Sequence, residues 1–305
     1  MKLSEIMKER TAFSFEVFQP KTDKGMSKLP DTLGHLCKWK PDYISCTYGA
    51  AGSGARKNLD VCKLIQNAGT IPVTHFTIIG NTRETIKEQI QDYLDNGVNH
   101  MLALRGDLPF GCIGTGGDFE YATDLVAFVR KEFGDQMEIA VAGSPEGHIA
   151  CKSPEADIAV LKQKQDNGAD YIMTQLCWDM EKFAYWLDAI RKAGITMPVD
   201  VGIMPVLDQA ATINMALSRN GCAMPQELTR IISENWIFPN PFVKDPFDTD
   251  VEGKKARFKE AGIEYTMKQI ARYRALGVEG IHMYALNKYE DVSAIIARSG
   301  MRTIV

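Results

Sequence analysis

The sequence predicts an α/β protein, a (β/α)8 TIM barrel that forms a single domain over residues 1–305. Three observations predict it: one type of helix-to-strand corner recurs along the chain, eight short runs favour β-strands, and most of these runs end at polar side chains. Parallel strands place their C-terminal ends at one face, where barrels of this class build active sites. The pattern therefore indicates an enzyme.

The recurring corner is a helical stretch that ends in Gly and is followed at once by a β-branched run. Five segments have this form: QNAGTIPVTHF, DNGVNHMLAL, DNGADYIMTQ, KAGITMPVDVGI and ALGVEGIHMY. Gly just after a helix takes the left-handed conformation at little cost and turns the chain back into the sheet. Five corners of one type predict a parallel sheet.

Eight runs are expected to form strands, each followed by a helical pattern. They are residues 11–18, 42–47, 71–77, 99–104, 137–142, 170–174, 198–203 and 279–284. The helices have legible starts: Asn81 or Thr82 fits the N-cap of one, and Ser153 with Pro154 fits the start of another. Eight such units close naturally into a barrel.

A doubly wound open sheet is the alternative fold, and it would favour a Gly-rich dinucleotide motif after an early strand. Residues 49–58, GAAGSGARKN, do not match GxGxxG, and we interpret them as a flexible loop. The irregular part is an insertion between strands seven and eight. Residues 221–253 contain a short helix and then a loop rich in Pro and aromatic residues, which we expect to pack on the barrel, cover the site or meet a partner.

Composition excludes several classes of function. The formal net charge of −4 and the absence of a long Lys/Arg run offer no basic face for nucleic acid. No signal peptide and no membrane-spanning stretch are legible, so we expect a cytoplasmic protein that does not contact membranes. The seven cysteines are scattered without a CxxC pair and the five histidines have no HxxxH spacing, so reduced thiols and no metal are expected.

Two carboxylates stand out as candidates for chemistry. Glu16 is flanked by apolar residues in AFSFEVF, and alternation along the strand would place it on the same side as Ser14. Desolvation there would raise its pKa and suit a general acid, although a salt-bridged structural carboxylate is the alternative. Asp107 follows a Gly that permits close approach of a ligand, or it simply forms a turn before Leu-Pro.

Other candidates carry weaker signals when taken separately. His75 ends the run IPVTHF, where a buried, hydrogen-bonded histidine is an equal interpretation. Gln175 ends YIMTQ and offers the donor and acceptor that the edge of a heteroaromatic ligand requires. Lys164 and Asp157 lie on an expected helix, where solvated surface charges are the ordinary interpretation.

Taken together, these residues belong to motifs that resemble the methylenetetrahydrofolate reductases in order and spacing. The motifs are FSFEVFQPKT, DYISCTYGAAGSGARKN, PVTHFT, GVNHMLALRGDLP, the stretch Ala142 to Lys164 with PEGH and KSPEAD, GADYIMTQ, GIMPV and HMYALNK. The resemblance extends from about residue 11 to 298, and LALRGDLP and SFE are quite specific to that family.

The resemblance implies a barrel that binds FAD noncovalently at the C-terminal strand ends, with hydride passing from a reduced nicotinamide to flavin N5 and then to 5,10-methylenetetrahydrofolate. Glu16 matches the general acid that assists opening of the imidazolidine ring, Asp107 the carboxylate beside flavin and pterin, and Gln175 a pterin contact. The FAD contacts carry over to Thr47, His75, Leu104, Arg105, Gly106, Asp107, Ala142, His148, Asp157 and Lys164. Tyr284 matches a residue near the folate, and Lys288 stands where the family often has Arg for the glutamate tail.

The chain also departs from the family pattern. Val17 and Gln19 change FEFFPP to FEVFQP, Ser144 replaces a Tyr before PE, and Ala211 and Met215 replace a Gln and a Phe that contact substrate or nicotinamide in enteric-type members. The leading hypothesis is a folate reductase that uses NAD(P)H and forms a homo-oligomer. The alternatives are a subunit that takes electrons from an electron-transfer partner protein, and a barrel that binds a pterin without a flavin.

Overall fold

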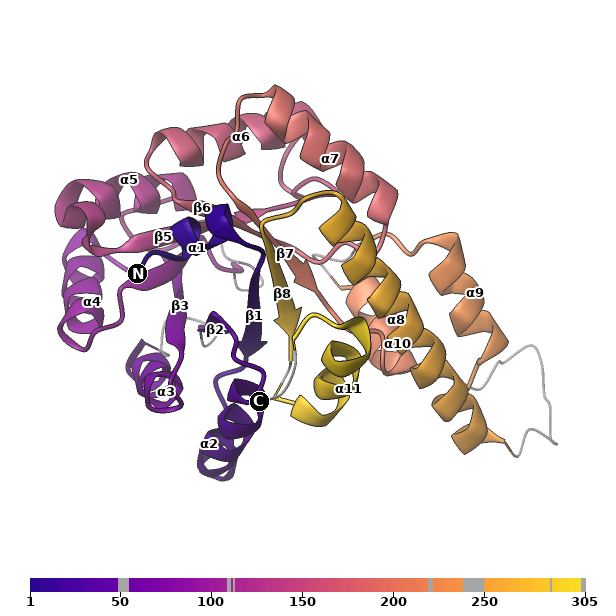
Figure 1. Cartoon of the computed structure of the whole chain (residues 1–305). Helices are drawn as coiled ribbons and strands as arrows, with labels where there is room; N and C mark the ends of the chain where they lie inside the picture. Colours follow the sequence, from indigo (N-terminus) through magenta and orange to yellow (C-terminus); the bar gives the residue numbers. More distant parts are fainter. Residues whose placement is uncertain are drawn as a thin grey trace.

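The computed structural model describes residues 1–48, 55–108, 111, 113–218, 222–237, 250–285 and 287–302. Eight parallel strands close into a barrel in chain order, and helices surround them (Figure 1). The strands are β1 (Ala12–Val17), β2 (Tyr43–Cys46), β3 (Ile71–Thr77), β4 (His100–Leu104), β5 (Glu138–Gly143), β6 (Tyr171–Thr174), β7 (Val199–Ile203) and β8 (Gly280–Tyr284). The predicted barrel is confirmed, and each strand begins and ends within one residue of its expected bounds.

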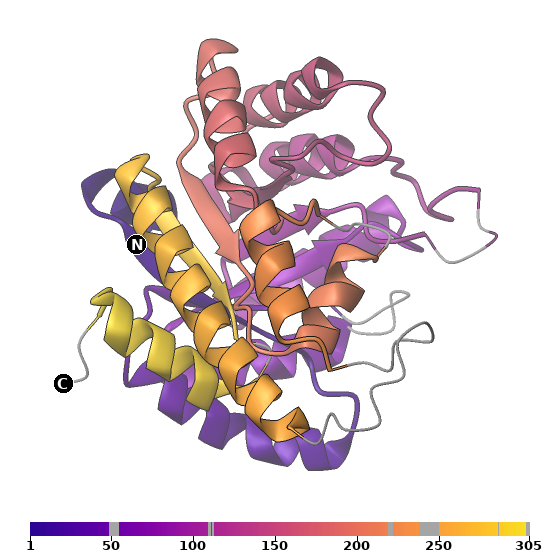
Figure 2. The ribbon, with the colours of Figure 1, turned by 90° about the vertical axis from the view of Figure 1, so that its right-hand side faces the viewer.

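Apart from α1, which precedes β1, the helices follow the strands along the chain and lie around the barrel (Figures 1 and 2). They are α1 (Leu3–Glu9), α2 (Asp23–Cys37), α3 (Ala55–Asn67), α4 (Arg83–Asp95), α5 (Ala122–Phe133), the short 3-10 helix η2 (Gly134–Gln136), α6 (Pro154–Asp166), α7 (Met180–Lys192), α8 (Gln209–Ala216), α9 (Gln226–Glu234), α10 (Val251–Ala275) and α11 (Tyr289–Ser299). The caps act as predicted: Thr82 accepts from the backbone N–H of Thr85, and Ser153 caps α6 before Pro154.

The five predicted corners all have Gly with positive φ between helix and strand. They are Gly69, Gly97, Gly168, Gly194 and Gly277, with φ from 74° to 99°. In this left-handed region a side chain costs free energy, which explains why Gly stands at this position, two residues after the last helical residue in each case. The corners set the start of β3, β4, β6, β7 and β8, and they account for the accuracy of the strand prediction.

The barrel interior differs between its two ends. At the N-terminal end α1 inserts Leu3, Ile6 and Met7 into an apolar cluster with residues such as Tyr43 and Val73. The first turn of α1 is held from inside the barrel by Glu138, as its carboxylate accepts hydrogen bonds from the Leu3 N–H, the Ser4 N–H and the Ser4 hydroxyl. This end of the barrel is therefore closed, and the C-terminal strand ends are left to bind ligands.

Along β1 the side chains alternate between the two sides of the barrel wall, as expected. Phe13, Phe15 and Val17 pack outward in the main core between strands and helices. Ser14 and Glu16 point the other way and contact His282 of the neighbouring strand β8. The interior of the barrel therefore presents a polar column on this side.

The predicted insertion, residues 221–253, lies between β7 and β8; it contains α9 and ends in the first turn of α10. The expected short helix is α9, whose Leu228 and Ile231 pack in one cluster with Phe258 and Tyr265 of α10. In Figure 2 α10 lies beside α11 on the outside of the barrel. Trp236 is 40% exposed. The other loop aromatics, Phe238, Phe242 and Phe247, lie outside the described residues, as does most of the predicted loop after β2.

Six cysteines are free thiols, and the seventh, Cys112, lies outside the described residues. In the part of the chain that the structure describes, no helix is both long and apolar enough to cross a membrane.

Candidate active site

The centre of the site is the Glu16 carboxylate at the C-terminal end of β1. Its side chain is 13% exposed, and Glu16 Oε2 lies 3.5 Å from His75 Nε2 and 3.6 Å from His282 Nε2. The strand register explains this grouping, because β1 pairs with β8 and places Glu16 opposite Tyr284, two residues after His282. One carboxylate therefore faces two imidazoles from two other strands.

The predicted direction of the pKa shift of Glu16 is wrong. Burial raises it, as the sequence suggests, but His282 and the charge of His75 lower it by more, and the pKa lies below its usual value. Burial lowers the pKa of His75, although Glu16 opposes that change. The two histidines come from strands remote in sequence, so the pattern around Glu16 alone gave no sign of them. The structure makes Glu16 a carboxylate held between proton-binding partners.

A cluster of buried polar side chains lies beneath Glu16, and the sequence did not predict it. His282 is fully buried; its Nδ1 lies 2.7 Å from Ser14 Oγ and its Nε2 lies 3.2 Å from Ser45 Oγ. The Tyr43 hydroxyl donates to Asp200 Oδ2 at 2.5 Å, and Asp200 is fully buried as well. The available signal was period-two alternation, which puts such residues on the inner faces of β1, β2, β7 and β8.

The loop after β4 carries the motif of Leu104, Arg105, Gly106 and Asp107. Gly106 has φ of +86°, and a Cβ placed there would lie 2.9 Å from Ile79 Cδ1. A residue with a side chain would thus be strained and crowded at this position. Asp107 is exposed at the start of the loop, next to the strand ends. The positive φ and the crowding by Ile79 account for Gly at this turn, and the close approach of a ligand stays a prediction.

The loop after β5 and helix α6 bring four more predicted residues together. The Lys164 ammonium donates to the Ala142 carbonyl at 2.8 Å, and Asp157 Oδ2 accepts from the His148 backbone N–H at 3.2 Å. Burial lowers the pKa of Lys164, and the nearby Asp157 charge opposes that change. Both helix residues therefore face the strand ends, and neither is the solvated surface charge that the helix pattern allows.

Electrostatic effects on His148 connect this group to the β4 loop. Burial lowers the pKa of His148, and the Asp157 carboxylate opposes that change. Arg105 and Lys164 then lower it further through their positive charges, whereas Asp107 raises it. The residues after β4 and β5 therefore form one mixed-charge region with two cations and two carboxylates.

The remaining predicted residues lie at other strand ends. Thr47 follows β2, and its hydroxyl accepts from the Gln19 N–H at 3.3 Å. Gln175 follows β6 with an exposed side chain, whose amide oxygen accepts from the Leu176 N–H. The Tyr284 hydroxyl donates to the Thr174 carbonyl at 3.0 Å, across a position where a Cβ on Gly202 would clash.

Glu16 lies near the C-terminal end of β1, and Asp107 and Gln175 follow β4 and β6 of the same parallel barrel, so these three residues lie at the same end of the molecule. Direct contacts join Glu16 to His75, and the residues after β5 to one another. Lys288 is exposed at the N-cap of α11, and its backbone N–H bonds to the Ala285 carbonyl. No described contact brings Lys288 to Glu16.

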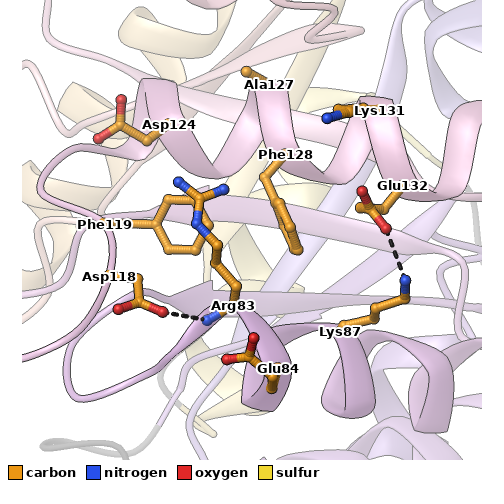
Figure 3. A pocket seen from close by; sticks show the side chains of 10 residues that line it. All are labelled: Arg83, Glu84, Lys87, Asp118, Phe119, Asp124, Ala127, Phe128, Lys131 and Glu132. Atoms are coloured by element: carbon orange, nitrogen blue, oxygen red, sulfur yellow. Dashed lines mark hydrogen bonds and ion pairs between the residues drawn. The ribbon is translucent and has the colours of Figure 1, made fainter.

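A surface cavity lies away from this site, on the outer ring between α4 and α5. It has a volume of about 560 Å³, and the Arg83 guanidinium lies 4.8 Å from the centre of the Phe119 ring (Figure 3). Asp118 accepts from the Arg83 backbone N–H, and Lys87 pairs with Glu132 at 2.8 Å. These charges are already partnered, and none of the lining residues comes from a strand end.

Comparisons with known proteins agree with this arrangement. The family model described as methylenetetrahydrofolate reductase matches residues 2–300. "Methylenetetrahydrofolate reductase (NADH) 1" of Arabidopsis thaliana is 32% identical over 307 residues, which cover 96% of this chain and 49% of that protein. "5,10-methylenetetrahydrofolate reductase" of Salmonella typhimurium is 32% identical over 290 residues, covering 95% of this chain and 90% of that protein. The chain thus spans about half the length of the plant relative and nearly all of the bacterial one.

Among solved structures, an uncharacterized protein from Clostridium thermocellum that binds two copies of 5-methyl-5,6,7,8-tetrahydrofolic acid superimposes with a TM-score of 0.61. The match covers 98% of each chain at 11% identity, which supports the fold alone. The family match over nearly the whole chain, together with relatives above 30% identity, decides the assignment: this chain belongs to the methylenetetrahydrofolate reductase family.

Proposed function

We propose that this chain is a flavin-dependent enzyme that reduces 5,10-methylenetetrahydrofolate to 5-methyltetrahydrofolate with a reduced nicotinamide as donor. The observation that carries the proposal is the Glu16 carboxylate, nearly buried at the C-terminal end of the barrel and faced by His75 and His282. Opening the imidazolidine ring of the substrate requires a proton at a ring nitrogen, and Glu16 is the group placed to hold and deliver it. Family membership supports the same assignment.

The residues after β4 and β5 fit FAD. Arg105 and Lys164 supply cations for a diphosphate, and Gly106, with its positive φ, makes the turn between Arg105 and Asp107. We assign the cofactor contacts to Thr47, His75, Leu104, Arg105, Gly106, Asp107, Ala142, His148, Asp157 and Lys164. The chemistry that bound FAD supplies is hydride transfer between a reduced nicotinamide and the folate.

The substrate contacts follow from the chemistry of a pterin with a glutamate tail. The Gln175 amide provides a donor and an acceptor for the heteroaromatic edge, and Asp107 places a negative charge beside the reacting rings. Tyr284 would flank the folate from β8, next to Glu16 in the strand register. The exposed Lys288 ammonium suits the carboxylates of the tail.

The low pKa of Glu16 is compatible with an acid role once the folate is bound. In the free protein His282 and His75 favour the charged carboxylate. A bound pterin would exclude water from the rim of the barrel, and the charged form of Glu16 then becomes costlier. Substrate binding thus favours the protonated carboxyl group when the proton is needed.

The identity of the electron donor is argued separately, because Ala211 and Met215 replace the two family residues expected to contact the nicotinamide. Ala211 in α8 is exposed, and Met215 packs against the apolar cluster of α9 and α10. Neither side chain supplies the amide or aromatic ring found there in enteric-type relatives. NADH is the donor we propose, and a partner protein is the alternative that the experiment separates.

The test is an anaerobic titration of the yellow, FAD-loaded protein. NADH should bleach the flavin, and 5,10-methylenetetrahydrofolate should restore its absorption with formation of 5-methyltetrahydrofolate. Bleaching only by an artificial reductant, with folate still reduced, would contradict the nicotinamide donor and favour a partner protein. Failure of the reduced protein to react with folate would contradict the function itself.

The variant Glu16→Gln isolates the proton step. It should still be bleached by NADH, whereas folate reduction should slow by about two orders of magnitude or more, the usual effect of losing a general acid. The control is Glu5→Gln, an exposed position of α1 at the opposite end of the barrel, which should leave both steps unchanged. Folate reduction by Glu16→Gln at the wild-type rate would remove the assigned role.

A further inference from the structure

The loop after β6 carries Gln175, the proposed pterin contact, on a backbone that is otherwise buried. The loop lies between Thr174, where β6 ends, and Met180, where α7 begins. Gln175 is exposed, whereas residues 176–178 are buried. Because buried backbone carbonyls require hydrogen-bond donors, and this segment belongs to neither a strand nor a helix, its donors must come from elsewhere in the fold.

Three side chains of α10 supply those donors. The Tyr273 hydroxyl donates to the Cys177 carbonyl at 2.6 Å, and Gln269 Nε2 donates to the same carbonyl at 3.1 Å. The Tyr265 hydroxyl donates to the Trp178 carbonyl at 2.7 Å. A carbonyl oxygen accepts two hydrogen bonds through its two lone pairs, so the Cys177 carbonyl is fully satisfied by α10.

The three donors form one polar stripe on a helix that lies on the outside of the barrel (Figure 1). Tyr265, Gln269 and Tyr273 are four residues apart, which places them on one face of α10 at successive turns, and all three are fully buried. Among the described residues Gln269 Oε1 is buried without a hydrogen-bond partner. A methionine of similar length would avoid that cost, so the amide is not explained by packing alone.

The chain that enters Gln175 is fixed as firmly as the chain that leaves it. The Gln175 backbone N–H donates to the Gly143 carbonyl of β5 at 2.8 Å, and the Thr174 carbonyl accepts from the Tyr284 hydroxyl of β8. The Leu176 N–H donates to Gln175 Oε1 at 3.0 Å, so the loop backbone also restrains the side-chain amide. Gln175 is therefore an exposed side chain on a backbone held by the barrel on one side and by α10 on the other.

We propose that Gln269 and Tyr273 are positioning residues for the folate, which hold the Cys177 carbonyl and thereby preorganise the Gln175 amide for the edge of the pterin. The inference rests on the proposed function, because it takes the pterin as the ligand of Gln175. A side chain on a fixed backbone loses less conformational entropy when a ligand binds, so preorganisation increases affinity without any contact between α10 and the folate. Folate binding should therefore depend on α10, whereas reduction of the flavin should not.

The first test reads the loop directly and needs no folate. Hydrogen–deuterium exchange of the FAD-loaded protein, measured by mass spectrometry, should be faster at residues 175–178 in Tyr273→Phe than in the wild type, and unchanged in β6. The matched control is Tyr93→Phe in α4, which also removes a buried tyrosine hydroxyl, one that donates to Asn58 Oδ1 at 3.0 Å. Unchanged exchange at residues 175–178 in Tyr273→Phe overturns the inference, whatever the enzyme catalyses.

The second test asks whether α10 acts through Gln175. Calorimetric titration of the oxidised, FAD-loaded protein with 5-methyltetrahydrofolate should give a Kd about two- to tenfold higher in Tyr273→Phe, the effect of one lost hydrogen bond, and an unchanged Kd in Tyr93→Phe. In a Gln175→Ala background, Tyr273→Phe should raise the Kd no further. Additive losses in the double variant would overturn the inference, because α10 would then affect folate binding by another route.

The variant Gln269→Met separates positioning from stability. Because it removes a buried amide oxygen that has no partner, it should keep or raise the temperature of thermal unfolding while it weakens binding of 5-methyltetrahydrofolate. A lower unfolding temperature with unchanged affinity would show a purely structural residue and overturn the inference. A wild type that binds no 5-methyltetrahydrofolate would instead contradict the proposed function, and the exchange experiment would still decide whether α10 holds the loop.

Discussion

Asp200 should make the protein less stable as the pH rises, and Asp200→Asn should remove that dependence. The carboxylate is fully buried in β7, and burial raises its pKa from 3.8 to about 6, although His282 and the hydrogen bonds from Tyr43 and Ser14 act to lower it. The folded protein therefore binds this proton more tightly than the unfolded chain does. Its stabilising contribution is complete below the unfolded pKa and is lost as the pH rises through about 6.

The size of the effect follows from the two pKa values. A difference of about two pH units corresponds to about 3 kcal/mol in the free energy of unfolding over the whole range. Part of this is lost below pH 5, so the wild type should lose about 1.4 kcal/mol between about pH 5 and pH 8 from Asp200 alone. Asparagine does not ionise, so Asp200→Asn should gain about that amount relative to the wild type over the same interval.

Urea unfolding of the two proteins at several pH values measures this difference directly, because groups unaffected by the substitution cancel. Tyr43→Phe is the companion variant: it removes a donor to Asp200 Oδ2 and should raise the pKa of Asp200 further. The loss of stability should then extend to higher pH than in the wild type. If the free energy of unfolding of wild type and of Asp200→Asn changed with pH in the same way, the pKa of Asp200 would not be raised by folding.

Two further predictions concern the loop after β4 and the closed end of the barrel. Gly106→Ala should destabilise the protein by about 2–3 kcal/mol and weaken FAD binding, whereas Gly80→Ala, with φ of +72° but open space around its Cβ, should cost only about 1–2 kcal/mol and spare FAD. Equal losses in thermal unfolding would contradict the crowding argument. Glu138→Gln should cost about 3 kcal/mol, because three donors of α1 lose a charged acceptor. In the folded protein the pKa of Glu138 is lowered, because hydrogen bonds from His100 and Ser4 outweigh the effect of burial. The wild type should therefore lose stability as the pH falls below the pKa that Glu138 has in the unfolded chain. In Glu138→Gln the free energy of unfolding should depend less on pH in this acidic range.

The barrel could be predicted because its signals are local. Each corner needs only a helical stripe, a Gly such as Gly97 or Gly168 and a β-branched run, and these lie within a few residues of one another. The helix caps at Thr82 and Ser153 are local in the same way. Parallel strands joined by such units then have few ways to close, and the C-terminal ends converge without any knowledge of side-chain contacts.

The electrostatics of the site could not be predicted, because they depend on the register of strands remote in sequence. The apolar surroundings of Glu16 in AFSFEVF correctly indicate burial, which alone would raise its pKa. The sign reverses because β3 and β8 bring His75 and His282 to the same carboxylate. Asp200 gave no signal either, since an acidic residue in PVDVGI is as compatible with a strand end as with the interior of a barrel.

The polar layer beneath Glu16 is expensive for the fold, which argues that it serves the chemistry. Among the described residues Asp200 Oδ1 is buried without a hydrogen-bond partner, and an apolar residue in its place would avoid the cost of burying a charge. The apolar packing of α1 and its hydrogen bonds to Glu138 at the opposite end of the barrel stabilise the fold and offset this loss. A structural core does not require an acid whose pKa is about 6 and whose carboxylate is joined through Ser14 to a histidine beside Glu16. Positions that break the packing rules of the interior without a local gain are those where function is expected.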